Sequence, residues 1–199
     1  MSAPLTRSAI IDAARTLIAT EGLDAVSLRR LAAMLGVTAP ALYAHVEDKR
    51  DLLRGVAELE FAELISSFDA ITVTGHVARL RRLSRVYIER ALAEPELFRT
   101  MFLFPPEIDL TAATGEELPM ATASFRVAMD SVSAAIDAGD LRPADPLVAA
   151  LTLWTATHGV ADVLLLGFPF DDVTSDLVID SVIDTVLHGL GAPSTVGTG

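Results

Sequence analysis

The chain has 199 residues, of which 51% are hydrophobic, and carries a formal net charge of −12. This length is enough for a substantial core in one or two domains. The absence of cysteine excludes disulfide frameworks, thiolate metal sites and cysteine nucleophiles. Charged residues within the first 20 positions interrupt any signal-peptide core, so we expect a cytoplasmic protein.

The charge is unevenly distributed along the chain. Residues 1–55 contain seven basic and six acidic side chains, a charge of +1, whereas residues 56–199 contain eight basic and 21 acidic ones, a charge of −13. An acidic body behind a near-neutral head suits a reader of nucleic acid whose bulk stays away from the phosphates. The alternative is that acidity is simply common among cytoplasmic proteins.

Two helices are predicted at the start of the chain. Residues 6–20 repeat apolar side chains on one face, and Gly22 follows them as a stop. The next helix begins after Ser27, a natural N-cap, and ends at Gly36, which tolerates a left-handed conformation.

A third, shorter helix follows almost at once. Thr38 is its N-cap, Pro40 lies in its first turn, and we expect it to run about two turns to Val46. Two helices joined by a short glycine turn form a helix-turn-helix. The second helix of such a motif can enter a DNA major groove.

The rest of the chain is also predicted to be helical. Residues 48–68 form a long connector between the head and the body, and no alternating strand pattern occurs. The sequence therefore predicts an all-α fold with about nine helices, consisting of a three-helix head and a larger helical bundle. The remaining helices are predicted over residues 76–93, 95–104, 119–138, 146–166 and 175–190, with a loop over 111–116.

The helix over 76–93 carries a run of arginines that face at least partly outward. They form either a solvated face or a second DNA-contact patch. The residues are Arg79, Arg81, Arg82, Arg85 and Arg90.

The last two predicted helices are strongly apolar. The one after Asp145 has an apolar run of about 20 residues, which is long enough to span a membrane. Because His158 and Asp162 interrupt it and no basic anchors follow it, we expect it to be buried in protein, with no membrane contact. In the final helix, apolar residues form one stripe and aspartates another. Residues 191–199 are expected to be a flexible tail.

Residues 23–53 resemble the N-terminal domain of the tetracycline-repressor family of bacterial transcription regulators. The family pattern has a glycine turn, a Leu-Tyr pair, an aromatic or His two residues on, and then Lys-x-x-Leu. It occurs here as Gly36, Leu42-Tyr43, His45 and Lys49 to Leu52. In addition, Trp154-x-x-x-His158-Gly159 resembles a signature of one C-terminal subgroup.

The resemblance implies the division of labour along the chain. Residues 1–48 would bind DNA, residues 49–190 would bind a ligand and form a homodimer, and residues 191–199 would be the tail. The expected partners are a palindromic double-stranded operator and a small-molecule effector. Dimerisation would use the last two helices, whose apolar stripes exceed what packing on one body requires. The alternative is that these helices simply form the core.

Several head residues are candidates for DNA contact. Tyr43 and His45 have polar tips that can reach phosphates, Thr38 lies at a helix N-terminus, and Lys49 adds a charge. The alternatives are a core aromatic for Tyr43 and a surface residue for His45. Arg29 has the side chain best shaped to read a guanine edge. The full expected set is Ser27, Arg29, Thr38, Ala39, Pro40, Ala41, Tyr43, Ala44, His45 and Lys49.

The recognition helix is short of polar side chains. Its alanines and proline offer only apolar contacts to bases, so we expect modest direct readout, with Arg29 and DNA shape carrying more of the specificity.

A ligand site is expected among the central helices. Trp154, His158 and Asp162 are spaced four apart, so an aromatic wall would carry a polar pair, which either binds the ligand or is structural. The short helix over 95–104 contains no His, so an apolar or aromatic effector is expected rather than a chelated metal. The expected lining is Phe61, Leu64, Phe98, Met101, Phe102, Trp154, His158 and Asp162.

An enzyme is the alternative from another class, but the chain lacks its signatures. It has no G-x-S-x-G, no H-E-x-x-H and no Gly-rich phosphate loop, and its four histidines are scattered. We therefore predict no catalytic residues, metal or cofactor. A second alternative is a small-molecule-binding protein of the same fold that has lost DNA binding.

Overall fold

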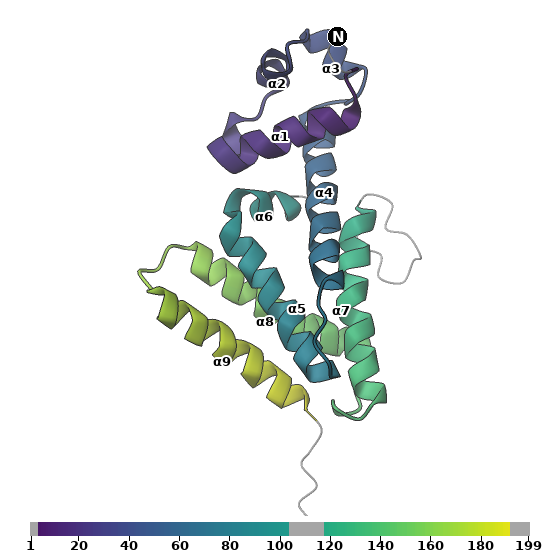
Figure 1. Ribbon diagram of the computed structural model, residues 1–199, viewed down its shortest axis with the longest axis vertical. Helices are drawn as coiled ribbons and strands as arrows, with labels where there is room; N and C mark the ends of the chain where they lie inside the picture. The colour runs from purple at the N-terminus through teal and green to yellow at the C-terminus, as the bar shows by residue number, and fades with distance from the viewer. Residues whose placement is uncertain (1–3, 104–117, 192–199) are drawn as a thin grey trace, which may run out of the picture. The chain divides into compact units, whose positions relative to one another are not determined.

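The computed structural model describes residues 4–103 and 118–191, and these residues fold into helices (Figure 1). Among them there is no strand, only an isolated bridge between Leu141 and Gly191, so the all-α prediction is confirmed. Phe104, the predicted 111–116 loop and the tail beyond Gly191 lie outside the described residues. The helices are α1 Arg7–Glu21, η1 Leu23–Ala25, α2 Leu28–Leu35, α3 Ala39–Tyr43, α4 Lys49–Asp69, α5 His76–Ala93, α6 Pro95–Met101, α7 Pro119–Asp137, α8 Pro146–Leu165 and α9 Asp172–Leu190.

The chain divides into two compact units. Unit 1 consists of Met1–Glu63 and Glu94–Thr122, and unit 2 of Leu64–Ala93 and Ala123–Gly199. Helices α4 and α7 therefore begin in unit 1 and end in unit 2. The predicted boundaries at residues 48 and 190 concern function rather than compactness, and they stay predictions.

Local capping explains where most helices begin and end. Ser27 Oγ accepts a hydrogen bond from the Arg30 backbone N–H at 3.2 Å, and Gly36 ends α2 in the left-handed region with φ 67°. Asp145 likewise accepts the Leu147 and Val148 backbone N–H groups at the start of α8. These starts and stops match those predicted from the sequence.

Three helix ends differ from the prediction by about three residues, and one of them is the end of α6, at Met101 instead of residue 104. Helix α3 ends at Tyr43 instead of Val46, since the chain turns there to bury Val46 in the head core. Helix α9 begins at Asp172, three residues early, because Asp171 caps it by accepting the Thr174 backbone N–H at 2.7 Å.

The core of unit 1 joins the first four helices to α6. Leu17, Leu31, Leu42 and Leu52 are almost completely buried together, and Leu97 of α6 belongs to the same cluster. Helix α6 packs against α1. The sixth helix is therefore part of the framework that supports the helix-turn-helix.

An ion-pair network reinforces this framework. Arg15 Nε of α1 donates to Glu60 Oε1 of α4 at 2.5 Å, although the Glu60 side chain is only 2% exposed. The same guanidinium lies 3.9 Å from Glu94, the N-cap residue of α6. Two residues earlier on α4, Glu58 accepts the Met120 backbone N–H at the start of α7. Two α4 carboxylates thus bind α1 and α7, and Arg15 of α1 extends the network to α6.

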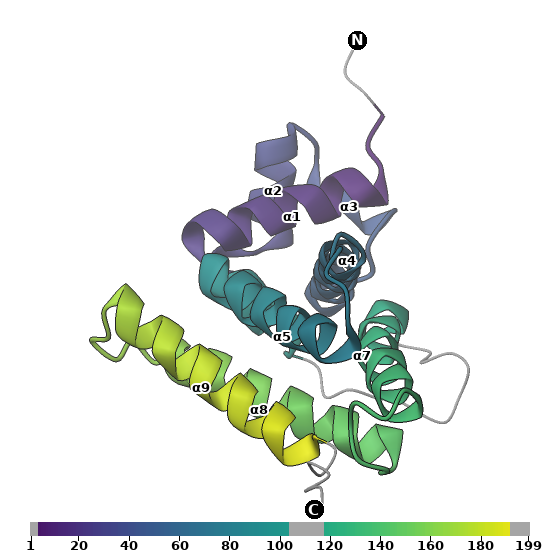
Figure 2. The ribbon, with the colours of Figure 1, turned by 60° about the horizontal axis from the view of Figure 1, so that its bottom comes forward.

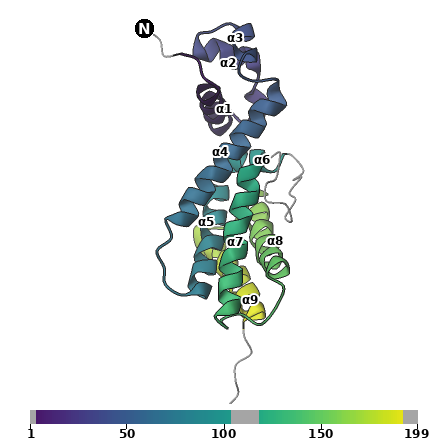
Figure 3. The same ribbon diagram turned by 90° about the vertical axis from the view of Figure 1, so that its right-hand side faces the viewer.

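In unit 2, helices α5, α8 and α9 lie side by side (Figure 2). Figure 3 shows α7 running beside α5 and α8. Arg85 of α5 pairs with Asp176 at 2.6 Å and with Asp180 at 2.5 Å, and Arg81 pairs with Asp184. The aspartate stripe of α9 therefore faces the arginines of α5.

Helix α8 is only partly covered. It has the length and mean hydropathy, 1.4, of a membrane-spanning helix, and 33% of the 18-residue window is buried. A single such helix is weak grounds for a membrane span, because the core helix of a soluble protein meets the same criteria. The expected burial within one chain is thus incomplete, and its exposed residues include Val148 and Val163.

Candidate functional site

The helix-turn-helix separates side chains that form the core from side chains that face outward. Leu42 is fully buried, whereas Tyr43 is 58% exposed, so Tyr43 is not the core aromatic that the alternative reading required. Arg29, Thr38 and Lys49 are exposed as well. The Thr38 hydroxyl makes no capping hydrogen bond, although Thr38 is the N-cap residue of α3. Its side chain is therefore not used to hold α3.

The other candidate DNA-binding residues are distributed unevenly over the same surface. His45 is half-buried, and Ser27 is exposed but uses its hydroxyl oxygen as the α2 cap. On the recognition helix, Pro40 and Ala44 are exposed, whereas Ala39 and Ala41 are half-buried.

A bidentate ion pair fixes the turn between α3 and α4. Arg7 donates to both carboxylate oxygens of Asp51, at 2.7 and 2.8 Å, and also to the His45 backbone carbonyl at 2.8 Å. Asp51 additionally accepts the Glu47 backbone N–H at 3.0 Å. The hydrogen bond from Arg7 holds the pKa of Asp51 below its ordinary value. This pair positions the chain between His45 and Lys49.

The expected ligand residues separate into two groups. In unit 1, the Phe61 and Phe102 rings meet edge to face with centroids 5.8 Å apart, and Phe98 lies 5.2 Å from Phe102. Met101 is buried in the same unit. In unit 2, Leu64 is buried, and Trp154, His158 and Asp162 follow one another on α8. The structure thus brings together members of each group within its own unit.

A polar chain connects α8 with Tyr87 of α5. Trp154 Nε1 donates to Tyr87 Oη at 3.3 Å, and Tyr87 Oη lies 2.7 Å from His158 Nδ1. His158 Nε2 in turn lies 3.3 Å from Asp162 Oδ2. With Nε2–H directed to the carboxylate, Nδ1 is the acceptor for the tyrosine hydroxyl. Burial raises the pKa of Tyr87, so its hydroxyl stays protonated.

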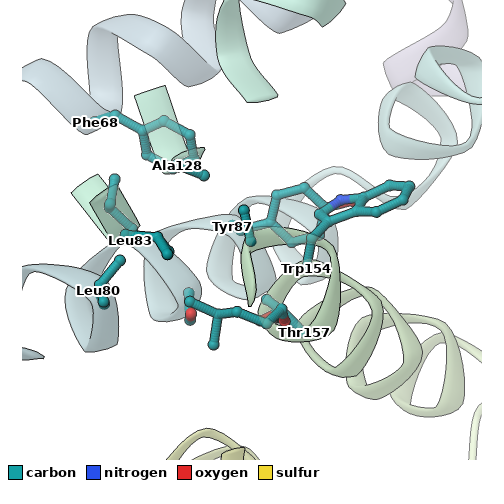
Figure 4. Close-up of a pocket in the computed structure, with 11 residues that line it drawn as sticks. Phe68, Leu80, Leu83, Tyr87, Ala128, Trp154 and Thr157 are labelled. Atoms are coloured by element: carbon teal, nitrogen blue, oxygen red, sulfur yellow. Dashed lines mark hydrogen bonds between the residues drawn. The ribbon is translucent and has the colours of Figure 1, made fainter. Parts of the chain in front are cut away.

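A cavity in unit 2 adjoins this polar chain (Figure 4). It has a volume of about 40 Å³, and Tyr87 and Trp154 lie at one end of it. Of the eight expected ligand residues, only Trp154 lines it. The lining consists of Phe68, Leu80, Leu83, Ser84, Tyr87, Ala128, Val132, Ala150, Leu153, Trp154 and Thr157.

Sequence reasoning missed the contribution of α5 to this cavity. Leu80, Ser84 and Tyr87 recur every three or four residues on one face, a spacing that marks a packed helix face. The prediction for this helix concerned only its arginines, which lie between these residues in the sequence. Within residues 4–103 and 118–191, no group of three or more His, Cys, Asp or Glu side chains is arranged to hold a metal ion.

Two family models match the chain. One, described as bacterial regulatory proteins of the tetR family, matches residues 10–56, and the other, described as a tetracyclin repressor-like C-terminal domain, matches residues 80–188. Together with the helix-turn-helix geometry, these matches are decisive. The chain belongs to the tetracycline-repressor family. Its members are DNA-binding transcriptional regulators, typically ligand-responsive. The Trp-x-x-x-His-Gly subgroup stays a prediction.

Individual tetracycline-repressor relatives agree with this assignment. An uncharacterized HTH-type transcriptional regulator of Mycobacterium tuberculosis, Rv0681, is 26% identical over 98% of this chain and 86% of its own. The class D tetracycline repressor of Escherichia coli is 46% identical, but over only 28% of this chain and 25% of its own.

Solved structures extend the likeness to the whole fold. A Rhodococcus sp. RHA1 protein of unknown function has a TM-score of 0.77 at 28% identity, covering 95% of this chain and 97% of its own. RolR in complex with resorcinol has a TM-score of 0.68 at 17% identity, covering 94% and 88%.

Proposed function

We propose that this protein is a cytoplasmic repressor that binds a palindromic operator as a homodimer and is released by a small apolar or aromatic effector. The observation that carries the proposal is the outward exposure of Tyr43 beside a fully buried Leu42. An exposed tyrosine that contributes little to the core has its hydroxyl available for a phosphate.

The head residues would divide the work of DNA binding. Thr38, Tyr43, His45 and Lys49 would contact phosphates and so fix the position on the duplex. Arg29, exposed and without a partner among the described residues, would read a base edge. Ser27 and the small residues Ala39, Pro40, Ala41 and Ala44 would line the interface, with apolar contacts to thymine methyl groups at most.

The proposed dimer uses α8 and α9. Leu177 and Val173 of α9 are 65% and 68% exposed, and Val148 and Val163 are exposed on α8. A second copy related by twofold symmetry would cover these exposed apolar side chains. Twofold pairing would place the recognition helices about 34–36 Å apart to match a palindrome.

The proposed effector site lies in unit 2, at the cavity between α5, α7 and α8. The resorcinol complex of RolR is a precedent for a small aromatic ligand in a chain of this fold. Because α4 is one continuous helix with residues in both units, it is the natural element to transmit binding. Release of DNA requires that the effector bind the two conformations unequally.

The proposal is tested with purified protein and DNA from its own promoter region. A palindrome there should bind with an affinity that falls as salt rises, and the double variant Tyr43→Phe/Lys49→Ala should bind all sequences more weakly. A compound screen on the complex should then find an effector that releases the DNA. If the protein binds the palindrome no more tightly than it binds unrelated DNA, the proposal of a DNA-binding regulator is wrong.

A second candidate is a small-molecule-binding protein of the same fold with weak or lost DNA binding. The small residues on the recognition helix favour it, because they offer few specific contacts. Ligand binding without operator binding in the same test would select this candidate.

A further inference from the structure

The hydroxyl of Ser84 is the unusual group in the unit 2 cavity. Ser84 is only 5% exposed and lines the cavity from α5. Within residues 4–103 and 118–191, its Oγ has no hydrogen-bond partner. Thr157, which lines the cavity from α8, instead donates to the Leu153 backbone carbonyl at 2.8 Å. Because Ser84 lines the cavity, a molecule bound there can supply the partner that the described protein groups do not.

The other polar groups of the cavity are already engaged. Tyr87 Oη accepts from Trp154 and donates to His158, and the Thr157 hydroxyl is bonded to its own helix. All eleven lining side chains are uncharged, and most are aliphatic or aromatic. A charged ligand would lose its hydration here without meeting an opposite charge, which is strongly unfavourable.

We infer that this cavity binds an uncharged, mainly apolar ligand with one hydrogen-bonding group, and that the Ser84 hydroxyl selects the ligand by bonding to that group. The inference rests on the proposed effector site and adds the chemical class of the effector. The Ser84 hydroxyl can donate or accept, so a phenol, an alcohol or a ketone meets the requirement.

The size of the cavity adds a mechanical requirement. At about 40 Å³ it is smaller than the cavity of about 150 Å³ that accommodates benzene. A ring-sized ligand must therefore push lining side chains apart on α5, α7 or α8. Such a ligand binds a widened conformation in preference to the closed one, as a conformational switch requires.

The test compares three small probes on the intact protein without DNA. Phenol and toluene have the same number of heavy atoms but differ in the hydroxyl, and benzoate adds a negative charge. Trp154 is the only tryptophan and lies at the cavity, so its fluorescence reports binding, with calorimetry as a second readout. We expect phenol to bind about five- to tenfold more tightly than toluene. We expect benzoate to show no saturable binding.

Ser84→Ala should remove the preference. Phenol affinity should fall about five- to tenfold, because its hydroxyl loses its partner, whereas toluene affinity should not fall, because toluene makes no hydrogen bond to Ser84. The matched control is Ser66→Ala, an exposed serine on α4 outside the cavity, which should behave like the parent protein. Circular dichroism checks that each variant is folded. The phenol-to-toluene ratio of the parent protein tests the inference even if Ser84→Ala is unstable.

Four results would each overturn the inference: equal affinity for phenol and toluene, saturable binding of benzoate, an unchanged phenol affinity in folded Ser84→Ala, or no response to any probe. None of them involves DNA. A protein that selects phenol but binds no operator would keep the inference and lose the repressor proposal. The opposite outcome is a protein that binds none of the three probes but is released from DNA by some other effector. That protein would keep the repressor proposal and lose the inference.

Discussion

Leu42 and Tyr43 are sequence neighbours with opposite environments, and this contrast explains how a five-residue helix can serve both folding and recognition. The leucine anchors α3 in the core of unit 1, and the tyrosine next to it points to solvent. Substitutions at the two positions should therefore have separable effects, on stability at Leu42 and on DNA binding at Tyr43.

Arg29 provides the sharpest test of base reading. Arg29→Ala should weaken binding to the operator by about 1–3 kcal/mol and relax the preference at one base pair, since a bidentate contact to a base would be lost. Fluorescence anisotropy on operators varied at each position measures this. Lys49→Ala is the comparison: it should weaken all DNA alike and reduce the salt slope by about 1. If Arg29→Ala also weakens all sequences equally, Arg29 contacts phosphate instead.

The Arg7–Asp51 pair should make stability depend on pH. Because the folded-state pKa of Asp51 is lowered from 3.8, its contribution is present above that value and is lost as the pH falls through the lower folded-state pKa. Asp51→Asn should therefore cost about 1 kcal/mol at pH 7, a modest value because Arg7 is 44% exposed, and less below about pH 4.

Urea unfolding of both proteins across this pH range measures the difference. Asp69→Asn, at the exposed end of α4, serves as the control. A deficit in Asp51→Asn that stays constant down to pH 3 would contradict the assignment.

Among single residues, the sequence could predict those whose role is local. Ser27, Gly36 and Asp145 act through their own helix ends, so their residue types reveal them. Ser84 and Tyr87 act through helices distant in sequence, and nothing nearby in the chain identifies the partners. For this reason the predicted ligand set named Trp154 of the cavity but none of the α5 residues facing it.

Helix α4 depends on a buried charge, because Glu60 is 2% exposed and Arg15 is its ion-pair partner. Removing Arg15 takes away the ion-pair partner at 2.5 Å from a carboxylate that stays buried, so Arg15→Ala should lower the free energy of unfolding by about 3 kcal/mol. The double variant Arg15→Ala/Glu60→Gln should recover part of that loss, since a neutral amide is cheaper to bury. Chemical denaturation gives the free energy of unfolding of the parent protein, of Arg15→Ala and of the double variant.

The matched control for this prediction is Arg30→Ala. Arg30 pairs with Glu21, but both side chains are more than 40% exposed, so its loss should cost less than about 1 kcal/mol. Equal costs for Arg15→Ala and Arg30→Ala would mean that Glu60 gains little from its partner.

Helix positions were largely predictable, whereas helix partners were not. Periodicity and caps located α5, α7 and α8 to within about one residue of their ends. The α5 arginines, however, could not be assigned to a solvated face or a DNA patch from their own segment. Their pairing with α9 depends on two helices 90 residues apart lying side by side. The shared four-residue spacing of Arg81 and Arg85 with the α9 aspartates was the available signal.

The whole molecule should function as a dimer through the exposed apolar residues of α8 and α9. Leu177→Asp should shift the protein from twice its 21.1 kDa chain mass to the monomer, because a charge would be buried without a partner in the interface. Operator affinity should fall with it, since one head makes too few contacts. Analytical ultracentrifugation measures the mass.

Val73→Asp is the matched control for the dimer. Val73 is an exposed apolar residue in the loop before α5 and belongs to neither α8 nor α9, so this variant should stay dimeric. A Leu177→Asp protein that remains dimeric and binds operator normally would exclude this face as the interface.

The ion pairs between α5 and α9 also bear on how precisely these helices are aligned. Arg81 and Arg85 are one turn apart, as are Asp176, Asp180 and Asp184, so sliding α9 by one turn of about 5.4 Å would pair Arg81 with Asp180 and leave Arg85 paired with Asp176. The charges therefore hold the helices together without choosing between two alignments. That choice falls to the interlocking shapes of the buried side chains Ile179, Ile183 and Leu187.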